Sequence, residues 1–169
     1  MKKRITMLLI SVITIGVLNA QDGKPVNELP KDAVIKQVEK PAFLAAFPTS
    51  NWSDYADISW YNASETNFEI STAEQLAGLA KLTKAGNKMI GKNFKLMQNI
   101  DIQAHLWDPI GYNNNNPFSG NFDGNNKTIS NLQINRANGD WLGLFGQFVS
   151  ATVKDLTLDG SKIYGKDTS

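Results

Sequence analysis

The chain has 169 residues, with 17 Lys and Arg against 16 Asp and Glu, and it contains no cysteine. The absence of cysteine excludes disulfides, thiolate metal sites and a cysteine nucleophile. The length suffices for one modest domain, and the balanced charge without a basic stripe argues against nucleic acid as a partner.

The first twenty residues have the pattern of an export signal. Residues 2–4 are basic, residues 5–17 are mostly apolar, and Ala20 is a small residue where a signal peptidase would cut. The apolar stretch is shorter than the roughly 20 residues that span a bilayer, which favours a cleaved signal over a membrane anchor. We therefore predict a signal peptide over residues 1–20 and no membrane span after cleavage. The predicted location is secreted or in the cell envelope, at the outer surface or in the periplasm.

Residues 21–50 are predicted to be a linker or an N-terminal arm, because four prolines interrupt a weak apolar pattern. Residues 51–93 are predicted to form an N-terminal cap that combines short aromatic-rich extended pieces with one helix.

This helix is expected at about residues 72–85. Ser71 and Glu74 have the spacing of a capping box, and Ala and Leu recur at helical spacing after them. Gly86 follows as a left-handed stop.

A six-residue pattern then occurs three times, at residues 97–102, 129–134 and 153–158. In each copy an apolar residue is followed two positions later by Asn or Asp, and then by an aliphatic, a polar and a second aliphatic residue. The copies start 32 and 24 residues apart. A repeat of this period predicts structural coils that stack on one another and bury a shared apolar face.

Each copy is predicted to turn at its Asn or Asp. Val153 and Leu156 can both face a core only if the chain bends at Asp155, and Asn and Asp tolerate a left-handed bend. The same argument places corners at Asn99 and Asn131. Two buried columns are then expected, one of Ile100, Leu132 and Leu156 and the other of Ile102, Ile134 and Leu158.

These patterns together predict an all-β fold, a parallel β-helix (β-solenoid) over residues 94–169 with a short N-terminal capping helix. A solenoid that stops just after its third copy leaves strand edges and an apolar face open. We therefore expect the natural protein to be longer than this chain.

Three segments carry a resemblance to a known family: Trp-Asp-Pro-Ile-Gly at residues 107–111, residues 118–132, and Gly-Leu-Phe-Gly at residues 143–146. With them, the chain resembles the GLUG-motif family of bacterial surface proteins over about residues 68–165. The resemblance implies a right-handed parallel β-helix on a secreted or surface protein, and it implies no particular reaction. Some members flank metallopeptidase domains, but this chain has a single histidine, His105, and so lacks their His-Glu-x-x-His zinc motif.

No catalytic residue, metal site or cofactor is predicted. His105 is interpreted as a structural residue, since one histidine alone makes neither a metal cluster nor a catalytic set. Paired acids of a glycosidase would need about 5–9.5 Å between them, and Gln133 and Thr157 are expected to interrupt any ladder of acids beside Asp101. The acids considered are Asp101, Asp123, Asp155 and Asp159.

The candidate ligand-binding residues are the aromatic side chains Tyr112, Trp107 and Trp141, with Tyr164 as a further member of a sugar-stacking surface. The alternative is that these rings fill corners or cap the ends of the coils. Burial is favoured for Trp107 and exposure for Tyr112, which adjoins a run of asparagines.

The predicted function is a non-catalytic, exported cell-surface module for adhesion or for binding glycans or proteins of a host or neighbouring cell. One alternative is part of a β-helix carbohydrate-active enzyme, and another is the N-terminal scaffold of a larger surface metallopeptidase. Release of reducing sugars from polysaccharides would favour the first alternative.

Overall fold

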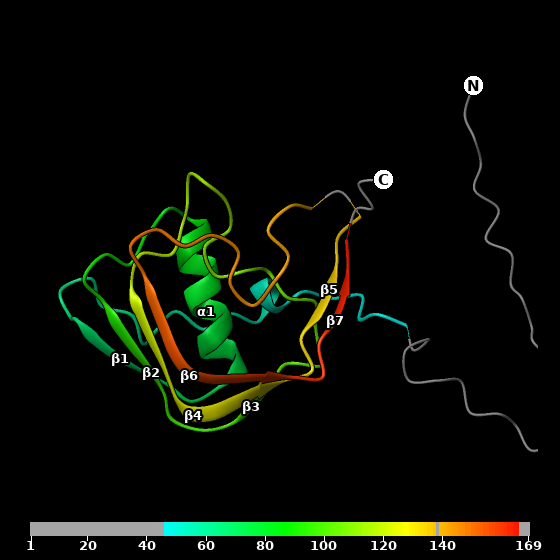
Figure 1. The fold of residues 1–169 in the computed structure, drawn as a ribbon, viewed down its shortest axis with the longest axis horizontal. Coiled ribbons are helices and arrows are strands. Elements are labelled where there is room, and N and C mark those ends of the chain that lie inside the picture. Colours follow the sequence, from blue (N-terminus) through cyan, green and yellow to red (C-terminus); the bar gives the residue numbers. More distant parts are fainter. Residues whose placement is uncertain (1–45, 138, 166–169) are drawn as a thin grey trace, which may run out of the picture. The chain divides into compact units, whose positions relative to one another are not determined.

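The structure is a computed structural model that describes residues 46–137 and 139–165 (Figure 1). Every described residue lies in one unit of the chain, Lys40–Ser169. The predicted signal peptide and most of the predicted arm lie outside the described residues.

The described residues form one five-stranded sheet, one two-stranded sheet and one α-helix. All pairs of strands are parallel. In the larger sheet the central strand β4 pairs with β2 and β3 and also with β6, and β2 pairs in turn with β1; β5 and β7 form the smaller sheet. In chain order the elements are η2 (Trp52–Asp54), β1 (Asn67–Ile70), α1 (Ala73–Lys84), β2 (Asn93–Leu96), β3 (Ile100–Asp101), β4 (Asn121–Ser130), β5 (Gln133–Asn135), β6 (Thr152–Asp159) and β7 (Lys162–Tyr164).

The prediction of an all-β, right-handed parallel β-helix is wrong. The described residues combine two small parallel sheets with α1, which buries Leu76 and Leu79 completely in the common core. Between β3 and β4, and between β5 and β6, the chain runs through long loops that touch their neighbours through isolated bridges. The fold is therefore mixed α and β, because a helix supplies part of the core that the prediction assigned to strands.

The predicted columns are also wrong. Ile100 pairs with Ile129, and Ile129 pairs with Leu158, which is a step of 29 residues from β4 to β6 and not 24. Ile134 pairs with Ile163 in the smaller sheet. The three copies of the hexapeptide look alike in sequence but do not occupy equivalent positions along the strands.

The corner residues explain this difference in register. Asn131 and Asp155 have positive φ angles of 60° and 52°, as predicted, whereas Asn99, which is also described, does not have a positive φ. Asn131 follows the end of β4, but Asp155 lies inside β6 beside Gly124. A Cβ on Gly124 would lie 2.5 Å from the Asp155 carbonyl oxygen, so the bend at Asp155 lies beside Gly124 in the middle of β4. The bend at Asn131 comes after β4 has ended, so the two bends are not aligned across the sheet.

The expected helix is present as α1, but its N-cap is one residue later than predicted. The Thr72 hydroxyl accepts a hydrogen bond from the Gln75 amide (3.2 Å), and the Gln75 side chain accepts from the Ser71 amide (2.8 Å). The helix therefore uses Thr72 and Gln75 in place of Ser71 and Glu74. Ala85 is the C-cap, and Gly86 follows with a φ of 102°.

Gly78 lies where α1 passes closest to the preceding loop. A Cβ at this position would lie 1.9 Å from the Asp57 carbonyl oxygen, which already accepts a hydrogen bond from the Trp60 indole (2.8 Å). The helix can approach this loop only because residue 78 has no side chain.

We expect Gly78→Ala to destabilise the fold by about 1–3 kcal/mol, because the added methyl group would overpack against the backbone. The same substitution in an open helix would stabilise it by about 1 kcal/mol, so the sign of the change is diagnostic. Urea unfolding followed by circular dichroism measures the difference, and a stabilised variant would contradict the close packing.

Two polar columns cross the larger sheet on its solvent side. In the first, Asn121 donates to Asn93 and Asn93 donates to Asn67, both at 2.9 Å, and Thr152 follows in β6. The second column alternates in charge from strand to strand. Its members are Glu69, Lys95, Asp123 and Lys154.

The last pair of the charged column is an ion pair of 3.0 Å between Lys154 Nζ and Asp123 Oδ2. The hydrogen bond from Lys154, together with one from the Asn125 amide, lowers the pKa of Asp123 below its ordinary value of 3.8. The hydrogen bonds to Asp123 and Asp155 raise the pKa of Lys154. Both groups are therefore charged near neutral pH, and opposite charges facing each other across strands stabilise the sheet modestly.

Because the folded-state pKa of Asp123 is lowered, its contribution to stability is present above pH 3.8 and is lost as the pH falls through the folded-state pKa. We expect Asp123→Asn to unfold at a lower temperature than wild type near neutral pH. The difference should narrow below pH 3.8. Asp159→Asn, which removes an exposed carboxylate outside the ion pairs, is the control; equal pH profiles for the two variants would contradict the role of Asp123.

Candidate ligand-binding site

An open pocket of about 410 Å³ lies where the loop after Ile110 meets the segment after β5. Its volume falls within the range of small-ligand sites. The pocket is lined by Tyr112, Asn113, Arg136, Gly139, Asp140 and Trp141. Two of the three predicted ligand-binding residues, Tyr112 and Trp141, therefore line one pocket.

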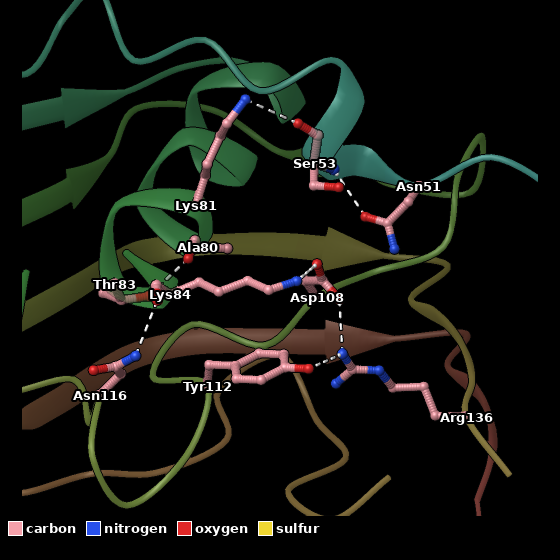
Figure 2. A network of polar contacts seen from close by, with 10 residues as sticks. All are labelled: Asn51, Ser53, Ala80, Lys81, Thr83, Lys84, Asp108, Tyr112, Asn116 and Arg136. Atoms are coloured by element: carbon pink, nitrogen blue, oxygen red, sulfur yellow. Dashed lines mark hydrogen bonds and ion pairs between the residues drawn. The ribbon is translucent and has the colours of Figure 1, made fainter. Parts of the chain in front are cut away.

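Asp108 anchors the wall of this pocket (Figure 2). One of its carboxylate oxygens accepts from Lys84 Nζ (2.8 Å) and the other accepts from Arg136 Nη2 (3.0 Å). The same Arg136 nitrogen donates to the Tyr112 hydroxyl (2.9 Å). The Asp108 residue is buried, so these bonds satisfy a carboxylate that would otherwise be costly to remove from water.

The Tyr112 ring is held in place by the two cations. Lys84 Nζ lies 4.7 Å from the ring centroid and Arg136 Cζ lies 4.9 Å from it, both within the range of cation–π attraction. Lys84 is in the last turn of α1, where a cation also favours the negative end of the helix. Tyr112 is therefore half-buried and restrained, and it is less exposed than the sequence predicted.

The turn before Tyr112 depends on Gly111. This residue has a φ of 75°, and a Cβ on it would lie 2.3 Å from the Gln147 carbonyl oxygen. Its amide donates to the Thr83 hydroxyl on α1 (3.1 Å). The glycine thus lets the loop pass close to its neighbours and directs the chain into the pocket.

Trp141 is the exposed aromatic side chain of the pocket, with 40% of its surface accessible. Its φ of 63° places a bulky residue in the left-handed region, which is a genuine outlier for such a side chain. Strained backbone of this kind persists where the surrounding structure holds it, and it is concentrated at functional sites.

Trp107 does not belong to the pocket. It is 1% exposed, and its indole nitrogen donates to the Leu144 carbonyl oxygen (3.0 Å) within the core. Tyr164 is exposed on β7 and is not among the residues that line the pocket. The burial predicted for Trp107 is confirmed. Its prediction as a ligand-binding residue is corrected, because the ring lies in the core and does not line the pocket.

Sequence reasoning missed Arg136, Asp140 and the anchoring residue Asp108. Asp108 is 28 residues from Arg136 and 24 from Lys84, so no local spacing connects them. The 28-residue step does equal the step from Asn93 in β2 to its partner Asn121 in β4. Knowledge of the strand register would therefore have predicted that residues 28 positions apart, such as Asp108 and Arg136, lie side by side.

Two further polar candidates, His105 and Asp101, have structural partners. His105 Nδ1 lies 2.6 Å from the Ser50 hydroxyl, and its ring stacks on Tyr55 with centroids 4.0 Å apart. Asp101 accepts from the Asn131 side chain (3.0 Å). Within residues 46–137 and 139–165 no group of three or more acidic or histidine side chains is placed to hold a metal ion.

The chain is similar to segments of two much longer proteins. A Gly-rich membrane protein of Evansella cellulosilytica is 40% identical over 80 residues, which are 43% of this chain and 9% of that protein. Halomucin of Haloquadratum walsbyi is 38% identical over 80 residues, which are 44% of this chain and 1% of that protein. The match thus spans less than a tenth of either relative.

No protein-family model matches the chain, and no solved structure matches it. The GLUG resemblance therefore stays a prediction. In the described part of the chain, no helix has the length and apolar character needed to cross a membrane.

We expect Asp108→Asn to destabilise the fold by about 2 kcal/mol, because Lys84 and Arg136 lose their shared anion. This is less than the loss for a fully buried pair, since 42% of the Lys84 side chain and 23% of the Arg136 side chain are exposed and can be hydrated. Urea unfolding measures the change. Asp140→Asn, which removes a carboxylate of the pocket lining without an ion pair, is the control, and equal losses would contradict the anchoring role.

Proposed function

We propose that this chain is a non-catalytic, exported surface module that binds a neutral glycan in the pocket of Tyr112 and Trp141. The observation that carries the proposal is the exposed Trp141 ring, held by an unfavourable backbone conformation beside Tyr112 and polar side chains. Aromatic rings offer an apolar face to the C–H groups of a sugar, and a few placed polar groups fix its orientation.

The charges around the pocket support a neutral ligand. The cations Lys84 and Arg136 are matched by the anions Asp108 and Asp140, so their formal charges cancel. The Nη2 group of Arg136 already donates hydrogen bonds to Asp108 and to Tyr112, so these two bonds are made within the protein. Asn113 and Asp140 lie on the lining and supply groups that can bond to sugar hydroxyls.

The arrangement of carboxylates favours binding over hydrolysis. Most glycosidases need two carboxyl groups that flank the bond to be cut. Among the described residues that line the pocket, Asp140 is the single carboxylate, and both oxygens of Asp108 accept hydrogen bonds from cations.

The name of one relative and the sequence resemblance support an exported, surface-associated protein. One relative is named as a membrane protein, and the resemblance to GLUG-motif proteins implies a secreted or surface location. Adhesion through a glycan would be the use of such a pocket on a cell surface.

The proposal predicts that the chain binds one or more neutral oligosaccharides on a glycan array, with affinity confirmed by calorimetry. Trp141→Ala should weaken binding at least about tenfold, which corresponds to about 1.4 kcal/mol. Trp141→Gly should weaken it as much, since glycine adopts the left-handed backbone without strain and so isolates the loss of the ring.

Tyr55→Ala is the matched control, because Tyr55 is an exposed tyrosine that does not line the pocket. It should leave the affinity unchanged. Glycan binding that is insensitive to both Trp141 variants would overturn the assigned site, and release of reducing sugars would overturn the non-catalytic assignment.

A further inference from the structure

The side chains that line the pocket of Tyr112 and Trp141 offer a ligand more hydrogen-bond donors than acceptors. Some of their polar atoms already bond within the protein, and the others are available to a ligand. A bound molecule loses affinity wherever it leaves a polar atom of the pocket unbonded. The available atoms therefore decide which glycans fit.

Asn113 presents only its side-chain nitrogen to a ligand. Its side-chain oxygen already accepts hydrogen bonds from two backbone amides, those of Asn115 (2.9 Å) and Asn116 (3.1 Å). These bonds fix the orientation of the side-chain amide, because only the oxygen can accept them, and they use both of its lone pairs. The Nδ2 group of Asn113 makes no hydrogen bond with any described residue, so its two N–H groups are free to donate.

Tyr112 and Arg136 supply further donors. The Tyr112 hydroxyl oxygen accepts from Arg136 Nη2 (2.9 Å), which leaves the hydroxyl hydrogen available for donation. Figure 2 shows that Nη2 bonds to both Asp108 and Tyr112, whereas Nη1 and Nε of Arg136 form no hydrogen bond within the described part of the chain. A guanidinium group has no acceptor, so these nitrogens can only donate.

Asp140 is the strong acceptor among the described side chains of the lining. Its carboxylate belongs to an exposed residue and forms no ion pair with the rest of the described chain. The lining therefore combines the donors of Tyr112, Asn113 and Arg136 with the acceptor of Asp140. A matching ligand must bring a group that accepts strongly beside one N–H or O–H that it can donate.

An acetamido group matches this distribution of donors and acceptors. Its carbonyl oxygen can accept two hydrogen bonds, here from Asn113 and Tyr112, and its single N–H can donate to Asp140. Its methyl group is apolar and can contact the Trp141 ring. The group is also uncharged, which agrees with the cancelling charges around the pocket. A sugar hydroxyl, in contrast, brings no apolar group beside its polar atoms.

We propose that this pocket selects an acetamido sugar, which is a neutral amino sugar whose nitrogen carries an acetyl group. The inference rests on the proposed function and assigns a specificity to the same pocket. Asn113 determines the preference, because its Nδ2 group donates to the carbonyl oxygen of the acetyl group. A site that donates to a polar group of its ligand discriminates against an analogue in which that group is missing.

Calorimetry with two matched trisaccharides, chitotriose and cellotriose, tests the preference on the full chain. The two have the same linkage between their sugars, and they differ in the acetamido or hydroxyl group on the second carbon of each ring. Chitotriose should bind at least about tenfold more tightly, because it gains a hydrogen bond to its carbonyl oxygen and buries a methyl group. The fully deacetylated trisaccharide, with ammonium groups in these positions, should bind more weakly than chitotriose.

Asn113→Asp tests the residue that determines the preference. An aspartate keeps an oxygen for the two backbone amides and replaces the Nδ2 donor with a second oxygen of nearly the same size. The variant should lower the affinity for chitotriose at least about tenfold and the affinity for cellotriose less, so that the ratio of the two approaches one. A purely structural loss would weaken both alike. Asn114→Asp, the same charge change at an exposed neighbour outside the lining, is the control and should keep the ratio.

The outcomes separate this inference from the proposed function. Equal affinities of wild type for chitotriose and cellotriose overturn the acetamido preference, whereas dependence of that binding on Trp141 would still support a glycan site. An unchanged ratio in Asn113→Asp overturns the inferred role of Asn113. Tightest binding of the deacetylated trisaccharide assigns recognition to the Asp140 charge and overturns the preference. A chain that binds no glycan at all overturns the proposed function and this inference together.

Discussion

Parallel pairing along β4 is the constraint on which the other features of this structure depend. The first residues of β4 pair with β2, its last residues pair with β3, and β6 follows it along its other side. Each of these pairings joins residues that are 28 to 31 positions apart in the chain, so the contacts are non-local and carry a cost in loop-closure entropy. Burial of aromatic and aliphatic residues on these strands opposes this cost. These residues include Phe68, Phe94 and Phe122, with the Phe68 and Phe94 rings stacked 5.3 Å apart.

The ligand pocket is a consequence of this pairing and not of any local motif. The loops that leave the sheet on successive strands lie next to one another, so Asp108 from one loop meets Arg136 from the next. The helix α1 brings Lys84 to the same carboxylate. One buried anion thereby fixes the end of a helix and two loops, and it positions the tyrosine of the pocket through Arg136.

The solvent face of the sheet carries a polar pattern that repeats from strand to strand. Asparagine side chains bond from strand to strand, and acidic and basic side chains alternate beside them. Inside the sheet these columns favour one register, because a slip along the strand would break the alternation of inward and outward residues.

The sequence by itself determined the features that depend on neighbouring residues: the helix near residues 73–84, the left-handed bends at Asn131 and Asp155, and the candidacy of Tyr112 and Trp141 as binding aromatics. Capping, helical periodicity and the tolerance of Asn and Asp for positive φ all act over a few residues, so they can be recognised along the chain. Strand register could not be obtained in this way, because the hexapeptide copies are similar over six positions whereas pairing is decided along whole strands, including the bulge between Asp123 and Lys127. Only the tertiary structure decided that α1 shares the core and that Asp108, Arg136 and Lys84 meet, because these depend on contacts between distant segments.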